Sequence, residues 1–86
     1  MDMCDADGPE AAGLRFVIYP GDHRPAHVHV IGQGGEAVFN LNCRRGVPLL
    51  REVYGLSRSD TARIRALVVT YKSVLCAAWE SIHGEA

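Results

Sequence analysis

The residues of this chain that are best suited to chemistry gather in one stretch, residues 22–30. It reads Asp-His-Arg-Pro-Ala-His-Val-His-Val and holds three of the four histidines. Imidazole titrates near neutral pH, so it can accept or release protons or, when neutral, ligate a metal ion. The same stretch adds an arginine, which suits a phosphate, and an aspartate, which suits a cation. These residue types point to acid–base catalysis or to metal binding.

The end of this stretch, residues 27–30, alternates histidine and valine. A period of two predicts a half-buried strand with both histidines on one face, about 7 Å apart along the strand. Two prolines stiffen the preceding loop, which carries His23 and Arg24. We therefore expect a stiff loop to hold these two side chains near the histidine-bearing face of the strand.

The elements around this stretch predict an α+β fold. Runs rich in β-branched and aromatic residues predict strands at 14–19, 26–31 and 36–42. Apolar residues at helical spacing predict one long amphipathic helix over residues 58–82. Residues 47–54 suit a short extra helix between Pro48 and Gly55, with a fourth strand as the alternative. The expected architecture is an antiparallel three- or four-stranded sheet packed on one face by a long C-terminal helix.

Strand parity predicts which side chains share the sheet face that the helix leaves uncovered. On this face we expect Arg15, Val17, Tyr19, His27, His29, Glu36, Val38 and Asn40. The catalytic candidates are His23, Arg24, His27 and His29. The substrate-binding candidates are Arg15, Tyr19, Glu36 and Asn40.

Length and charge set the frame for these candidates. Eighty-six residues make one small domain with a thin stability margin, which a homodimer would widen. Residues 1–12 hold four of the ten acidic residues, no basic residue and no apolar periodicity, so we expect a disordered acidic tail followed by a single domain over 13–86. The domain is then mildly basic, which is compatible with RNA or an acidic partner.

Compartment and redox state follow from three further observations. No apolar run approaches the roughly 18 residues that a membrane span needs. The N-terminus lacks the basic and apolar regions of a signal peptide. The three cysteines are far apart and form no metal-binding or redox pair, so we expect reduced, buried thiols. These features predict a cytoplasmic protein that does not enter a membrane.

Three interpretations of the histidine face remain open. Metal-independent cleavage of RNA would use histidines as acid and base and an arginine for the phosphate. A metal site would use His27 and His29 with His23 or Asp22, but structural zinc needs four ligands and no cysteine is well placed, so we expect no metal or other cofactor. A protein-binding face would need no chemistry, because such side chains also stabilise sheets.

The histidine stretch and its flanks resemble one bacterial family, domain of unknown function four-one-six-zero. The resemblance covers residues 14 to about 83 and rests on Phe16–Tyr19, Asp22–Val30, Glu36-Ala37 and Tyr54–Ser57 before the long helix. The family's shared residues fall here on His23, Arg24, Pro25, His27 and His29. The turn at residues 43–46 departs from many members, so the resemblance gives it no functional support.

The resemblance implies a role as well as a fold. Members are small bacterial proteins often encoded beside another small family, and the pair looks like a toxin–antitoxin module with this family as the toxin. We therefore expect a toxin that acts on RNA as a metal-independent ribonuclease and is neutralised by an antitoxin-like protein partner. The alternatives are a non-catalytic domain that binds a protein through the sheet and a small histidine-based metal-binding protein.

Overall fold

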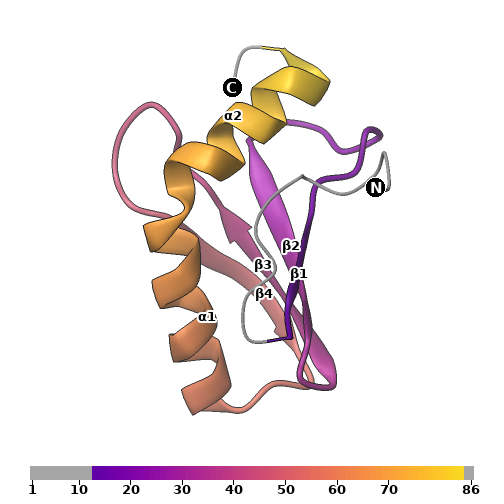
Figure 1. Cartoon of the computed structure of the whole chain (residues 1–86), viewed down its shortest axis with the longest axis vertical. Coiled ribbons are helices and arrows are strands. Elements are labelled where there is room, and N and C mark those ends of the chain that lie inside the picture. Colours follow the sequence, from indigo (N-terminus) through magenta and orange to yellow (C-terminus); the bar gives the residue numbers. More distant parts are fainter. Residues whose placement is uncertain (1–12, 85–86) are drawn as a thin grey trace.

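The computed structural model describes residues 13–84 and has a four-stranded antiparallel sheet with two helices on one face (Figure 1). The sheet order follows the chain: β1 (Arg15–Val17), β2 (His27–Gly32), β3 (Gly35–Asn40) and β4 (Leu49–Tyr54). Then come α1 (Arg58–Thr70) and α2 (Lys72–His83). The expected α+β class is confirmed. The predicted acidic tail, residues 1–12, lies outside the described residues.

The register of the ladders confirms the predicted division of side chains between the two sheet faces. His29 lies opposite Val17 of β1 and Val38 of β3, and His27 lies opposite Asn40. The alternate side chains join the helices in one core, which comprises Leu14, Phe16, Ile18, Ala26, Val28, Val30, Ala37, Phe39, Leu41, Ile64, Val68, Leu75, Cys76 and Trp79. Burying one such aliphatic or aromatic side chain contributes about 1.5–3 kcal/mol before entropy is subtracted.

The second sheet face is less open than expected. Val17, Val38 and His27 are all on it, and all three are buried. Only the side chains toward its rim are accessible, including Tyr19, which is 39% exposed. The face is therefore a packed polar cluster with an accessible margin, and its histidines do not lie on a flat solvated surface.

Residues 47–54 contain the fourth strand, so the short helix expected there is wrong and the alternative is confirmed. β4 pairs with β3 from Glu36↔Tyr54 to Asn40↔Leu49. Proline before the strand and glycine after it suit a strand as well as a helix, because both residues simply end regular structure. The pairing partner, which no local pattern reveals, decides the outcome.

The predicted single helix over 58–82 is also wrong, because it breaks at Tyr71 between α1 and α2. The break follows Val-Val-Thr, a run of β-branched residues with weak helix propensity. Thr70 Oγ1 donates to the carbonyl of Ala66 at 2.9 Å, a back-bond that often bends helices. α1 then runs along the sheet, while α2 turns across the end where β2 begins (Figure 1).

A disulfide joins the loop after β3 to α2, so the expectation of reduced thiols is wrong for Cys43 and Cys76. Their Cα atoms are 5.8 Å apart although 33 residues separate them in sequence. The Lys72 ammonium also donates to the carbonyl of Gly46, at 2.6 Å, which fastens the same loop to the start of α2. The bend at Tyr71 thus brings α2 to this loop. Neither helix in the described part is both long and apolar enough to cross a membrane.

Candidate functional site

A tight turn after β1 places Asp22 against the histidine-bearing face of the sheet. The Asp22 amide donates to the carbonyl of Tyr19 at 3.0 Å, which closes the turn through Pro20 and Gly21. Proline presets one backbone angle at the second turn position, and glycine follows it without steric cost. The turn therefore directs the Asp22 carboxylate back toward β2. The chain then passes through the cis Arg24–Pro25 bond into β2.

Asp22, His27 and His29 form one compact centre. The Asp22 Oδ2 atom lies 3.2 Å from Nε2 of His27 and 3.3 Å from Nε2 of His29. One ligand atom from each of the three residues lies within 4.8 Å of the others. His27 is 5% exposed, and the other two side chains are about one-fifth exposed or less. A nearly enclosed site of two imidazoles and one carboxylate therefore forms at the start of β2.

The opposite nitrogen of each imidazole has its own acceptor. His27 Nδ1 lies 2.8 Å from the carbonyl oxygen of Pro25, and His29 Nδ1 lies 2.8 Å from Glu36 Oε2. Oxygens of this kind accept hydrogen bonds, so each Nδ1 carries the proton and donates. This tautomer leaves both Nε2 atoms facing Asp22. Metal-ligating histidines are oriented in the same way, by donating their second nitrogen to a carboxylate or a backbone carbonyl.

Protons or a metal ion can fill this centre. Lone pairs on two neutral imidazoles and a carboxylate repel one another unless a cation lies between them, so either protons on Nε2 or a metal ion must balance them. Charge-assisted hydrogen bonds usually measure about 2.7–2.9 Å, which is shorter than both contacts to Asp22. Tetrahedral ligands about 2.05 Å from a zinc ion lie roughly 3.3 Å from each other. The observed spacing of the carboxylate from each imidazole fits two ligands of one ion, and the contact between His29 Nε2 and Asp22 Oδ2 also meets the geometry of a hydrogen bond.

An unsatisfied oxygen lies beside the centre. Asn40 faces His27 directly across the β2–β3 ladder, and its Oδ1 atom is buried with no hydrogen-bond partner among the described residues. Directly opposed residues have Cβ atoms about 4.5–5.5 Å apart. A buried oxygen without a donor is costly, so it suits a position where a metal ion, a water or a substrate group completes the site.

Aromatic rings support the centre on two sides. The Tyr19 ring meets His29 edge-on at 4.9 Å, and the buried Trp79 ring lies 5.4 Å from His27. His83 stacks on Trp79 at 3.8 Å from ring centre to ring centre. α2 therefore reaches the centre through Trp79. The sequence pattern assigned this tryptophan to the apolar stripe alone and gave no sign of the contact.

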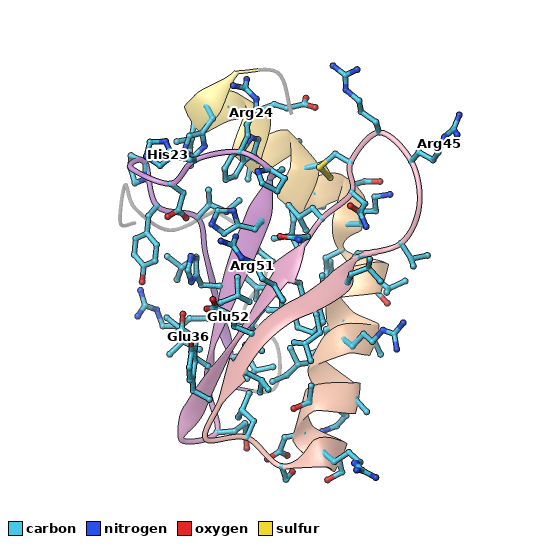
Figure 2. The ribbon with its side chains drawn as sticks, turned by 180° about the vertical axis from the view of Figure 1, so that it is seen from behind. His23, Arg24, Glu36, Arg45, Arg51 and Glu52 are labelled. Carbon is cyan, nitrogen blue, oxygen red and sulfur yellow. A yellow bond between two sulfur atoms is a disulfide. The ribbon has the colours of Figure 1, made fainter. Side chains whose placement is uncertain are left out.

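The structure separates the catalytic candidates into two groups. His27 and His29 come together in the centre, as strand parity predicts. His23 and Arg24 are exposed in the preceding loop, and His23 contributes no ligand atom to the three-residue cluster (Figure 2). Asp22, which the sequence offered only as an alternative third ligand, is the residue that joins the histidines.

The substrate-binding candidates have more varied places. Tyr19, Glu36 and Asn40 each adjoin a histidine of the centre. Arg15 lies two ladder positions beyond the Val17↔His29 pair, where it pairs with Ile31, and it is exposed at the rim. The first three are thus placed to influence the centre, and Arg15 lies outside it.

A basic cleft borders the same loop. It measures about 520 Å³ and is lined by Arg24, Pro25, Ala26, Asn42, Cys43, Arg44 and Arg45. Pro25 and Ala26 connect it directly to His27, since the Pro25 carbonyl also holds the His27 ring. Three guanidinium groups around one cleft favour an anion, and arginine can bind phosphate with two parallel hydrogen bonds.

Sequence comparison places the chain in a family. Residues 13–80 match the family described as Domain of unknown function (DUF4160). The chain belongs to this family. The family resemblance that the histidine stretch predicts is therefore confirmed. The centre formed by Asp22, His27 and His29 and the basic cleft both lie within the matched residues. No curated protein and no solved structure matches the chain.

Proposed function

We propose that this DUF4160 protein binds a divalent transition-metal ion, most suitably Zn²⁺, at Asp22, His27 and His29 and cleaves RNA there. The observation that carries the proposal is the convergence of both Nε2 atoms on one carboxylate oxygen, at 3.2 and 3.3 Å, with both Nδ1 atoms already held by acceptors. From the sequence alone we expect no metal, because a structural zinc site needs four ligands. Our proposal departs from that expectation, because a catalytic site needs only three protein ligands.

A site with three protein ligands suits catalysis. Catalytic zinc sites keep a coordination position for water or substrate, whereas structural sites close all four positions with protein. A metal ion held by two histidines and a carboxylate would supply Lewis-acid activation of water and of a phosphoryl oxygen. Glu36 fixes the His29 ring through Nδ1, and the buried Asn40 oxygen offers an acceptor for a bound water.

The surroundings favour a phosphate-containing polymer as substrate. The basic cleft adjoins the centre through Pro25 and Ala26, and Arg24, Arg44 and Arg45 line it. Contacts to the phosphate backbone provide most of the affinity of proteins for nucleic acids. A strand of RNA bound in the cleft would continue past the start of β2. This placement gives the turn at residues 43–46 a role that the family resemblance alone does not support.

The cellular role that we propose is that of the toxin in a two-protein module. A toxin that cleaves the RNA of its own cell needs a partner that neutralises it, so we infer an antitoxin-like protein that covers the basic cleft or the rim of the centre. An acidic segment would match three arginines in charge.

A second mechanism, metal-independent cleavage, has one observation in its favour. His29 lies between two carboxylates, Glu36 at 2.8 Å and Asp22 at 3.3 Å. A doubly protonated ring would satisfy both and could donate a proton to a leaving oxygen. Against this mechanism, both Nε2 atoms face the same carboxylate, whereas an acid and a base must act on opposite sides of a phosphate.

The deciding experiment uses protein purified without a histidine tag and total RNA as substrate. Cleavage is measured with chelator, after Zn²⁺ is restored, and in an Asp22→Asn variant, with Asp60→Asn on α1 as the matched control. We expect cleavage that chelator abolishes, Zn²⁺ restores and only Asp22→Asn removes. Cleavage that persists in chelator would favour the acid–base mechanism. A folded protein that binds RNA or protein without cleaving either would refute the enzymatic proposal.

A further inference from the structure

The edge strand β4 leaves a large apolar surface without a partner. The sheet order puts β4 at one edge, and all six of its residues are exposed. Four of them are large and apolar or aromatic: Leu49, Leu50, Val53 and Tyr54, with exposures of 40–58%. The opposite edge, β1, has three residues, two of them buried. A long exposed edge rich in apolar residues is a template for pairing with another strand.

A β-bulge gives β4 an unusual distribution of side chains. Leu50 and Val53 pair with Phe39 and Ala37, so they belong to the face that carries the helices. The partners of the other ladder residues, Leu49, Glu52 and Tyr54, are Asn40, Val38 and Glu36 on the face of the histidine centre. The register shift between Val38 and Phe39 leaves Arg51 as the extra residue of the bulge.

This distribution makes the strand complementary to itself. When two antiparallel strands pair, residues that oppose each other must project to the same face. A regular six-residue strand cannot pair along its whole length with a second copy, because its first and last residues face opposite sides. The bulge removes this obstacle, since Leu49 and Tyr54 share one face and Leu50 and Val53 share the other.

We propose that two copies of this chain associate through antiparallel pairing of β4 with β4, which forms one continuous eight-stranded sheet. In this register Leu49 opposes Tyr54 of the partner copy, and Leu50 opposes Val53. At the centre Arg51 opposes Glu52, so two opposite-charge pairs flank the two-fold axis. A shift by one residue would set Leu50 against Tyr54 on the wrong face, which singles out the full-length register.

Charge complementarity at the axis favours a second copy over an unrelated strand. Arg51 and Glu52 are consecutive on β4, both are exposed, and both are labelled in Figure 2. Opposite charges directly across two strands are stabilising, and like charges there are destabilising. An antiparallel strand of another protein would need a basic residue followed by an acidic one at the matching place, whereas a second copy provides both by symmetry.

The test measures the mass of the native protein by sedimentation equilibrium in four forms. Wild type is compared with Arg51→Glu, with the double exchange Arg51→Glu, Glu52→Arg, and with Arg65→Glu, an exposed charge reversal on α1. We expect wild type and Arg65→Glu to form the same dimer and Arg51→Glu to raise the dimer dissociation constant by roughly tenfold or more, because both central pairs become repulsive. The double exchange should restore dimerisation, since it recreates both pairs with reversed polarity.

Several results would overturn the proposal. One is a wild-type protein that stays monomeric at every concentration, whether or not β4 then pairs with another protein. Another is a dimer whose dissociation constant does not respond to Arg51→Glu, which would place the interface elsewhere. Gel electrophoresis without reductant detects a dimer that is linked by a disulfide. Such a dimer would count against pairing through β4. Circular dichroism of each variant confirms that the charge changes leave the fold intact.

Discussion

The carboxylate of Glu36 should control metal affinity without touching the metal. It lies 2.8 Å from Nδ1 of His29, on the side of the ring away from Asp22, and its side chain is 35% exposed. A carboxylate in this position fixes the tautomer and makes Nε2 a better donor, and its loss typically lowers metal affinity about 10–100-fold, or roughly 1.4–2.7 kcal/mol. We expect about a tenfold loss for Glu36→Gln, which keeps an acceptor, and a larger loss for Glu36→Ala.

The assay is competition for Zn²⁺ with a chromophoric chelator at fixed pH, with Glu52→Gln as the control. Glu52 is also exposed on the sheet, but its carboxylate accepts from Tyr54 Oη at 3.0 Å and is not a ligand of the centre. The control should bind Zn²⁺ as tightly as wild type. Unchanged affinity in a folded Glu36→Ala variant would refute the assigned orientation of His29, as would an equal loss in the control.

Three further predictions concern the scaffold around the centre. Gly35→Ala should lower the free energy of unfolding by about 1–3 kcal/mol in urea denaturation, because a Cβ there would lie 2.2 Å from the carbonyl oxygen of Tyr54. The control Gly21→Ala should be nearly neutral, because open space surrounds Gly21. An equal effect of the two would contradict the close approach of β3 to the end of β4. Reduction of the disulfide should lower that free energy by about 2–4 kcal/mol, because its 33-residue separation restricts the unfolded chain; an unchanged unfolding midpoint would contradict the linkage. Glu52 raises the pKa of Tyr54, mainly by accepting its hydrogen bond, so Glu52→Gln should lower that pKa. The measurement is an ultraviolet titration in which a Tyr54→Phe variant identifies the signal of Tyr54. An unchanged pKa would show that the contact does not persist.

Local periodicity predicted the layers of this fold and the faces of its strands. Alternation in residues 27–30 correctly put both histidines on one side. In the structure Gln33 and Gly34 adopt the positive φ values that a two-residue hairpin turn requires. Periodicity could not show the bend at Tyr71. The apolar stripe continues through it, and only the packing of α2 over the strand ends and the tie from Lys72 to the loop after β3 reveal why the direction changes.

The sequence identified only part of the candidate centre. Parity identified His27 and His29, but the sequence left His23 and Asp22 as alternatives for the third ligand, and the structure selects Asp22. The turn closed by the Asp22 amide and the Tyr19 carbonyl reverses the chain and decides which loop residue reaches β2. The contact of Trp79 with His27 and the linkage of Cys43 to Cys76 join segments far apart in sequence, so no local pattern contains them.

The central claim is that Asp22, His27 and His29 bind a metal ion, and metal content tests it most directly. The protein is produced without a histidine tag, dialysed against a trace of Zn²⁺ and assayed by mass spectrometry for metal per chain, beside Asp22→Asn and Asp60→Asn. The account predicts one equivalent per chain in wild type and in Asp60→Asn, and far less in Asp22→Asn. Metal-free wild type, or equal metal in all three proteins, would contradict it.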